Sequence, residues 1–167
     1  MPAKKILSLR DGGFLLVSYE SGGMSSMLKL DSLGNADWIS WIETLADVQS
    51  LIEDNVGRIV FVTKREIGAL DSQGNAMWKF FSRPGHNYEF VQQAHDGTYF
   101  VCGKRFQVQE AATLTSLNTS GQVLWEKHYS LAGNHMMGED VMQTSDLGYV
   151  SYWRGLLLLP AWQIHPL

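Results

Sequence analysis

The sequence predicts an all-β fold in which a unit of four short antiparallel strands occurs about three times and then begins a fourth time. Two repeated turns predict it. A turn with glycine four residues before tryptophan occurs three times. A second turn, which opens an apolar run, occurs four times and alternates with the first along the chain. Both turns carry the Asp, Asn and Gly residues that close β-hairpins, so each unit is expected to be a small sheet of hairpins.

The first turn supplies the clearest repeat. Its three copies are Asp31–Trp38, Asp71–Trp78 and Asn118–Trp125, with the glycines Gly34, Gly74 and Gly121 and the tryptophans Trp38, Trp78 and Trp125. The tryptophans lie 40 and 47 residues apart, which is the period of one propeller blade or one helical repeat. Because the copies recur in phase, we expect the glycines to permit the turns and the tryptophans to be packing residues.

The third unit shows its four strands most clearly. They are expected at residues 88–93, 99–103, 112–117 and 122–129, joined within the first pair by Asp-Gly and within the last pair by Asn-Thr-Ser-Gly. The fourth of these runs alternates between apolar and polar residues, which is typical of a half-exposed outer strand.

The second strand of each unit is apolar at every position, as in Phe14–Val17, Ile59–Val62 and Tyr99–Cys102. Such runs predict that both faces of the sheet are covered. Sheets that stand side by side around an axis provide dry inner strands and wetter outer ones, so the sequence predicts a β-propeller of four-stranded antiparallel blades.

The repeats assign residues 4–153 to propeller blades, at about 4–43, 47–82, 88–130 and 140–164. After Arg154 the turn motif is replaced by four leucines and Pro160, so residues 154–167 are either a degenerate half-blade or a non-native tail. Closed propellers have four to eight blades. If the four blades close, the protein is an unusually small ring. The interpretation that we favour is an incomplete ring, whose exposed blade faces are buried by self-association into a homo-oligomer or are left as an aggregation hazard.

One segment also permits a helix. Asn35 could cap a helix over Trp38, Ile42 and Leu45, whose spacing suits an amphipathic α-helix. In the next copy, however, Arg83-Pro84-Gly85 would stop a helix after barely two turns. The repeats therefore favour strands in both places.

Composition limits the classes of partner. The chain has 167 residues, 45% of them hydrophobic, with 13 basic and 17 acidic residues and a net charge of −4. This balance disfavours a nucleic-acid partner, and no apolar stretch approaches the length of a membrane span. Cys102, the single cysteine, is expected to be a buried and inert thiol. No signal peptide is visible, which indicates a cytoplasmic location if the N-terminus is native.

The repeats resemble bacterial β-propeller repeats of the pyrroloquinoline-quinone-like group, and more closely their relatives with "DGGY" and "LD-x-x-GN-x-x-W" blades. The matching text is DGGFLLVSY, LKLDSLGNADW, GALDSQGNAMW, DGTYFVCG and SLNTSGQVLW. The resemblance implies that each tryptophan docks one blade against the next. The quinoprotein pattern places alanine ten residues before the tryptophan and threonine before the glycine, whereas this chain has Leu28, Gly68 and Thr115, and Leu33, Gln73 and Ser120. No cofactor is therefore expected.

Two histidines give the only hint of a site. His86 and His135 lie in comparable connections from an outer strand to the next inner strand. Together with Asn87, Glu89, Glu139 and Asp140 they could form a polar or metal-binding cluster on one face of the ring. Solvated loop histidines are the more ordinary interpretation, and no metal ligand set is assigned. The Asp31 and Asp71 turns lack the ligands of calcium loops and are explained by turn formation.

No motif of an activated nucleophile or a phosphate-binding loop is present, so no catalytic residue is assigned. The first hypothesis is a non-catalytic propeller segment that binds a protein, peptide or carbohydrate. The alternative is part of a propeller enzyme, such as a quinoprotein-like dehydrogenase or a glycan-cleaving enzyme, with its site on the face of His86 and His135. A fragment without an independent role is the third possibility.

Overall fold

The computed structural model describes residues 3–20, 23–43, 47–106, 110–130, 137–146, 148–154 and 162–164, and every regular element among them is a strand. The strands form four separate antiparallel sheets that follow one another along the chain. We call these sheets blades 1 to 4. The predicted all-β fold of four-stranded antiparallel blades, three complete and one partial, is confirmed.

Each sheet is a meander in which sequential strands pair with one another. Blade 1 contains β1 (Lys5–Ser8), β2 (Phe14–Glu20), β3 (Met24–Leu30) and β4 (Ala36–Glu43). Blade 2 contains β5 (Val48–Glu53), β6 (Ile59–Thr63), β7 (Glu66–Leu70) and β8 (Ala76–Phe81). Blade 3 contains β9 (His86–Gln93), β10 (Tyr99–Arg105), β11 (Ala111–Leu117) and β12 (Val123–Tyr129). Blade 4 contains β13 (Met137–Gln143), β14 (Tyr149–Arg154) and β15 (Trp162–Ile164).

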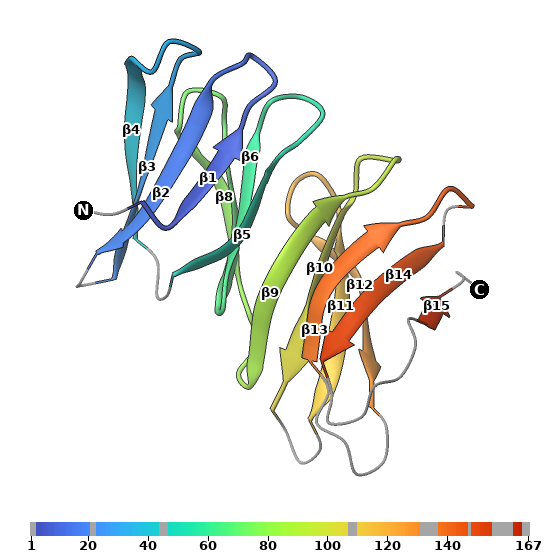
Figure 1. Cartoon of the computed structure of the whole chain (residues 1–167). Helices are drawn as coiled ribbons and strands as arrows, with labels where there is room; N and C mark the ends of the chain where they lie inside the picture. Colours follow the sequence, from blue (N-terminus) through green and yellow to red (C-terminus); the bar gives the residue numbers. More distant parts are fainter. Residues whose placement is uncertain are drawn as a thin grey trace.

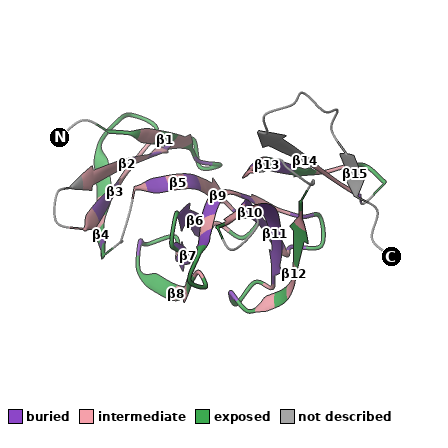
Figure 2. Ribbon diagram, turned by 90° about the horizontal axis from the view of Figure 1, so that it is seen from below, coloured by how far each residue is buried: buried purple, intermediate pink, exposed green. Residues whose placement is uncertain are grey.

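The blades stand side by side in an open arc, with the two termini at its opposite ends (Figure 1, Figure 2). The first strands β1, β5, β9 and β13 pack against one another in sequence along the inside of the arc. The last strands β4, β8 and β12 lie on the outside, where they are largely exposed. The four-leucine run, expected to be part of a degenerate half-blade or a tail, lies outside the described residues.

The hydrophobic core lies between blades. One cluster joins blades 1 and 2, a second joins blades 2 and 3, and a third joins blades 3 and 4. Alternate residues of one strand enter different clusters: in β6, Ile59 and Phe61 face blade 1, whereas Val60 and Val62 face blade 3. A strand that is apolar at every position is therefore buried on both faces because each blade has a neighbour on each side.

Blade 1 departs from this rule. Its strand β2 is apolar like β6 and β10, and Leu15 and Val17 are buried against blade 2. Phe14 and Leu16, on the other face, are only partly buried. The prediction that both faces are covered is thus wrong for β2, because no described blade stands on its outer side.

The repeated tryptophans occupy equivalent positions. The ring of Trp38 lies over Gly74 of blade 2, where a Cβ atom would come within 2.7 Å of the ring, and its Nε1 donates a hydrogen bond to the Ser72 carbonyl at 3.0 Å. The ring of Trp78 lies over Gly121 of blade 3 in the same way. Each of these glycines also has a positive φ, 82° and 81°. Glycine is required here both for the turn and for the room that the indole takes.

Hydrogen bonds repeat between the blades at the opposite edge of the sheets. The backbone amides of Arg10, Asn55 and His95 donate to the side-chain oxygens of Glu53, Gln93 and Gln143 on the next blade. Between blades 2 and 3 a buried contact is added, in which the Tyr99 hydroxyl donates to Asp54 at 2.6 Å. Burial alone would raise the pKa of Asp54, but hydrogen bonds from Tyr99 and Arg58 leave this pKa lowered.

The helix alternative is not realised. The segment that permitted it is taken by β4 and β5, and their residues pair with β3 and β6. Across the described ranges there is no helix of the length and apolarity that crossing a membrane requires.

Replacing Trp78 with alanine is expected to lower the free energy of unfolding by about 3 kcal/mol, because it empties a large aromatic site between blades 2 and 3. Leu124, on the exposed outer strand of blade 3, is the control, and Leu124→Ala should cost about 0.5 kcal/mol or less. Urea denaturation followed by circular dichroism measures both values. Equal losses for the two variants would contradict the role of Trp78 in joining the blades.

Candidate functional site

A cavity of about 630 Å³ opens at the end of the sheets where the chain passes from blade 2 to blade 3. Its walls come from the β6–β7 connection, from the β8–β9 connection with the adjoining strand ends, and from Phe106, which follows β10. They combine two cations, two aromatic rings and a polar pair: Arg65, Arg83, Phe81, Phe106, His86 and Asn87. A concave surface that combines apolar and charged side chains in this way is suited to a ligand.

Backbone hydrogen bonds fix these three connections together. The Arg83 carbonyl accepts from the His86 amide at 3.0 Å and closes a turn in which Gly85 has a φ of 79°. The Ser82 amide donates to the Arg65 carbonyl at 2.8 Å, and the Phe106 amide donates to the Gly85 carbonyl at 2.7 Å. The cavity wall is therefore held by main-chain contacts that do not depend on the identity of its exposed side chains.

Glu126 of β12 lies beside the cavity and is almost fully buried, with 11% of its side chain exposed. Its carboxylate is 3.6 Å from Arg83, 3.8 Å from His86 and 3.4 Å from His128, and it accepts a hydrogen bond from Thr115. A buried carboxylate needs such partners, because an unpaired one is costly to desolvate. Glu126 thus anchors Arg83 and His86 on the cavity wall.

His86 is buried, and its Nδ1 has no hydrogen-bond partner within the described chain. Burial lowers the pKa of His86, and the neighbouring His128, Arg105 and Arg83 lower it further, whereas Glu126 acts in the opposite direction. The lowered pKa favours the neutral form of the imidazole near pH 7.

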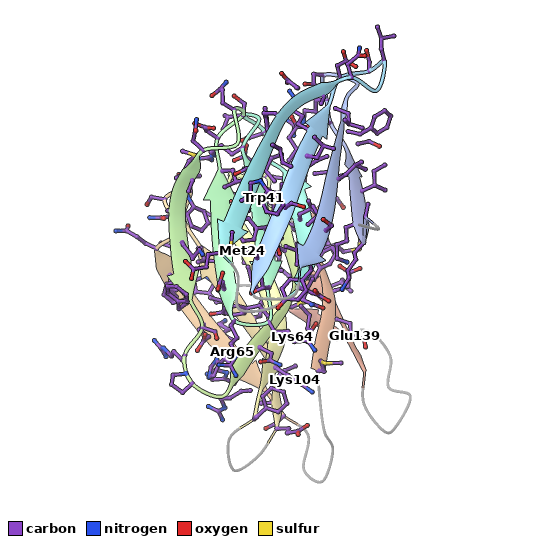
Figure 3. All side chains as sticks on the ribbon, turned by 90° about the vertical axis from the view of Figure 1, so that its left-hand side faces the viewer. Met24, Trp41, Lys64, Arg65, Lys104 and Glu139 are labelled. Carbon is purple, nitrogen blue, oxygen red and sulfur yellow. The ribbon has the colours of Figure 1, made fainter. Side chains whose placement is uncertain are left out.

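Positive charge gathers at this end of the molecule. Five of the 13 basic residues belong to the connections and strand ends around the cavity: Lys64, Arg65, Arg83, Lys104 and Arg105. Lys64, Arg65 and Lys104 lie together at the lower end of the sheets in Figure 3. Glu66, Glu89, Glu126 and Glu139 lie at the same end, but the charged side chains that line the cavity are Arg65 and Arg83, which favours an anionic ligand.

The residues proposed from sequence fall into separate places. His86 and Asn87 line the cavity, whereas Glu89 and Glu139 do not. Burial raises the pKa of Glu89; Lys64 and Lys104 lower it, and Glu139 raises it, which places these four side chains near one another. Asp140 is exposed and accepts a hydrogen bond from the Val141 amide. His135 lies outside the described residues.

Sequence reasoning misses most of the cavity. Arg65, Phe81, Arg83, Phe106 and Glu126 lie on four different segments that only the blade arrangement brings together. One local signal is present: Arg83-Pro84-Gly85 follows an exposed aromatic strand end, but taken alone it indicates only the stop of a regular element.

The described residues contain no group of three or more His, Cys, Asp or Glu side chains arranged to hold a metal ion. In the Asp31 turn, the carboxylate accepts from the amides of Leu33 and Asn35, so its oxygens serve the turn. The Cys102 side chain is buried, and burial raises the pKa of its thiol. The cavity lining itself, with Arg65, Arg83, Phe81 and Phe106, suits binding through charge and aromatic contact.

The lowered pKa of His86 makes stability depend on pH. Below the ordinary histidine pKa of 6.5 the unfolded chain takes up a proton more readily than the folded one, so the free energy of unfolding falls as pH falls through this window. We expect His86→Gln to reduce the loss of stability between about pH 7 and about pH 5, measured by urea denaturation. His95→Gln, which removes an exposed histidine at the other end of the sheets, is the control. An unchanged loss in His86→Gln would contradict a neutral buried imidazole.

Comparison with known proteins supports the fold. A scan against protein-family models finds no match, and a search of curated protein sequences finds none either. Solved structures do match. A protein of unknown function from Bacteroides caccae has 14% identity and a TM-score of 0.64, over 92% of this chain and 58% of that one. A streptogramin B lyase has 18% identity and a TM-score of 0.66, over 90% and 49%.

BamB from Moraxella catarrhalis has 14% identity and a TM-score of 0.61, over 86% of this chain and 44% of that one. This chain therefore spans about half the length of the structures it matches. At these identities the likeness concerns the fold alone. The blades, their order and these neighbours together identify the fold as a segment of a β-propeller.

Proposed function

We propose that this propeller segment is a non-catalytic binding module whose cavity between blades 2 and 3 takes an acidic side chain of a peptide or protein. The observation that carries the proposal is the pairing of Arg65 and Arg83 with Phe81 and Phe106 around one cavity. Guanidinium groups bind carboxylates through paired hydrogen bonds, and exposed aromatic rings bury apolar surface of the same ligand.

The exposure of these side chains supports binding at the surface. Phe81 and Phe106 are 57% and 43% exposed although both are large and apolar. The Arg83 side chain is 70% exposed and keeps only a 3.6 Å contact with Glu126. Glu126 therefore orients Arg83 without using up its five donors, and the remaining N–H groups can reach a ligand.

The neutral imidazole adds a second recognition element. His86 lines the cavity, but its Nδ1 is buried beside Glu126, so the ring acts on a ligand through its charge state. A carboxylate placed beside His86 would favour its protonated form, so binding should take up protons and become tighter as pH falls. Isothermal calorimetry in two buffers of different ionisation enthalpy detects this proton uptake.

The proposal is tested with two labelled hexapeptides, one alternating Glu and Phe and the other alternating Lys and Phe. Fluorescence anisotropy should show binding of the acidic peptide only. The double variant Arg65→Gln, Arg83→Gln should weaken it about tenfold or more, which corresponds to about 1.4 kcal/mol. Replacing both arginines with lysine keeps the charge and should restore part of the affinity.

Arg10→Gln is the matched control, because Arg10 is an exposed arginine at the opposite end of the sheets. It should leave the affinity unchanged. Equal affinity for the two peptides, or the same loss in the control, would contradict the proposal. If a uronic-acid trisaccharide binds with the same arginine dependence and the acidic peptide does not bind, the ligand is an acidic carbohydrate and not a peptide.

A further inference from the structure

The outer face of blade 1 has the chemistry of a blade-docking face, but no described blade covers it. We propose that it binds the outer face of blade 4 in a second copy of this chain, so that two copies close head to tail. This inference rests on the ends of the arc and is independent of the cavity between blades 2 and 3.

The outer face of blade 1 carries an unbroken apolar row across its four strands. Ile6 pairs with Leu16, Leu16 with Leu28, and Leu28 with Ile39. Ile6 and Ile39 are 65% and 55% exposed, and Trp41 beside them is 53% exposed. Figure 3 looks onto this sheet, with Trp41 and Met24 labelled on it. So wide an apolar surface marks an interaction site.

The two inner positions of this row are buried or partly buried in blades 2 and 3, whereas its outer two positions hold Gly68 and Lys79 in blade 2 and Thr115 and Glu126 in blade 3. In blade 2 the row begins with Leu51 and Phe61, and in blade 3 with Val91 and Val101. Phe61, Val91 and Val101 are each at most 1% exposed, because the preceding blade covers them. The inner part of the row on blade 1, Ile6 and Leu16, therefore belongs to an acceptor face whose covering blade is not among the described ones.

The indole position on this face is also empty. Gly74 and Gly121 are covered by the rings of Trp38 and Trp78, but a Cβ atom added at Gly34 would meet nothing within 4 Å. Gly34 nevertheless has the same backbone conformation, with a φ of 87°. The turn of blade 1 is thus shaped like the two turns that receive a neighbouring blade.

Blade 4 supplies the complementary face. Gln143 pairs with Tyr149 as Glu53 pairs with Ile59, so the adjacent pair Met142 and Val150 occupies the register of Ile52 and Val60. In blade 2 that pair belongs to the cluster shared with blade 3. In blade 4 Met142 is 56% exposed. The face that covers the next blade is therefore present at this end of the arc.

The repeated hydrogen bonds point to the same partner. Arg10, Asn55 and His95 each donate from the first turn of one blade to the next. Ser145 holds the equivalent turn position in blade 4, and Ser8 holds the equivalent acceptor position in blade 1. A second copy would bring these two positions together and continue the series.

The number of blades agrees with closure by two copies. Two chains would contain eight sheets, which is within the range of closed propellers. The matched structures are about twice as long as the part of them that this chain covers. A head-to-tail contact forms a closed dimer only when the rotation between the copies completes the ring, and a half-ring satisfies this condition.

Sedimentation velocity at tens of micromolar protein tests the proposal. A species of about 38 kDa is expected, twice the 18.8 kDa of one chain. Ile6→Glu on blade 1, at the position of the buried Val91 in blade 3, and Met142→Lys on blade 4 should each raise the dissociation constant at least about tenfold. Both positions are exposed in the single chain, so neither change should prevent folding, which circular dichroism checks. Leu124→Glu, on the exposed outer strand of blade 3, is the control and should remain dimeric.

Mixing the two variants separates head-to-tail from face-to-face contact. In a mixed dimer one contact is native, and at the other contact the two introduced side chains, both on first strands, carry opposite charges, so Ile6→Glu mixed with Met142→Lys should dimerise again. A monomeric wild type would overturn the proposal. Loss of the dimer in Ile6→Glu alone, with Met142→Lys unaffected, would show two blade 1 faces in contact and would also overturn it. Open polymers instead of a dimer would overturn closure.

Discussion

The structure depends on apolar sheet faces that are buried only by the next sheet. A single blade has no interior of its own, because its strands carry apolar residues on both faces and four strands cannot cover them. The indoles of Trp38 and Trp78 complete the contact at the outer edge, where each lies on a glycine of the following blade. Stability is therefore a property of neighbouring pairs of blades, as in other repeat proteins.

The same arrangement creates the cavity. Arg65, Phe81 and Arg83 belong to blade 2 or its exit, whereas His86 and Phe106 belong to blade 3. Their distances are fixed by main-chain hydrogen bonds between the connections, so the exposed side chains can differ without loss of the fold. This separation of scaffold from binding surface is typical of repeat folds, in which function resides in the loops.

Much of the fold could be predicted from sequence because its determinants are local and repeated. The turns at Gly34, Gly74 and Gly121 and the continuous apolar runs each need only a few neighbouring residues to be recognised. The cavity could not be predicted in the same way. Glu126 is distant in sequence from Arg83 and His86, and its partners depend on which face of β12 lies toward blade 2.

The outer face of blade 1 shows a related limit. A window around Phe14–Val17 has the same apolar character as those in β6 and β10, so local pattern cannot reveal that one of its faces lacks a neighbour. Likewise, the spacing of Trp38 and Ile42 suits a helix as well as a strand. Comparison between copies removes the second ambiguity, but burial at the end of an array is decided by what stands next to it.

The buried contact of Asp54 with Tyr99 makes the array uneven. Both side chains are fully buried, and they join the turn between β5 and β6 to β10 of the next blade. Pulling blades 2 and 3 apart would break this hydrogen bond to an ionised carboxylate, which is worth about 1.5–3 kcal/mol. The two central blades therefore form the cooperative unit that opens last, and their amide protons will exchange with solvent more slowly than those at either end of the arc.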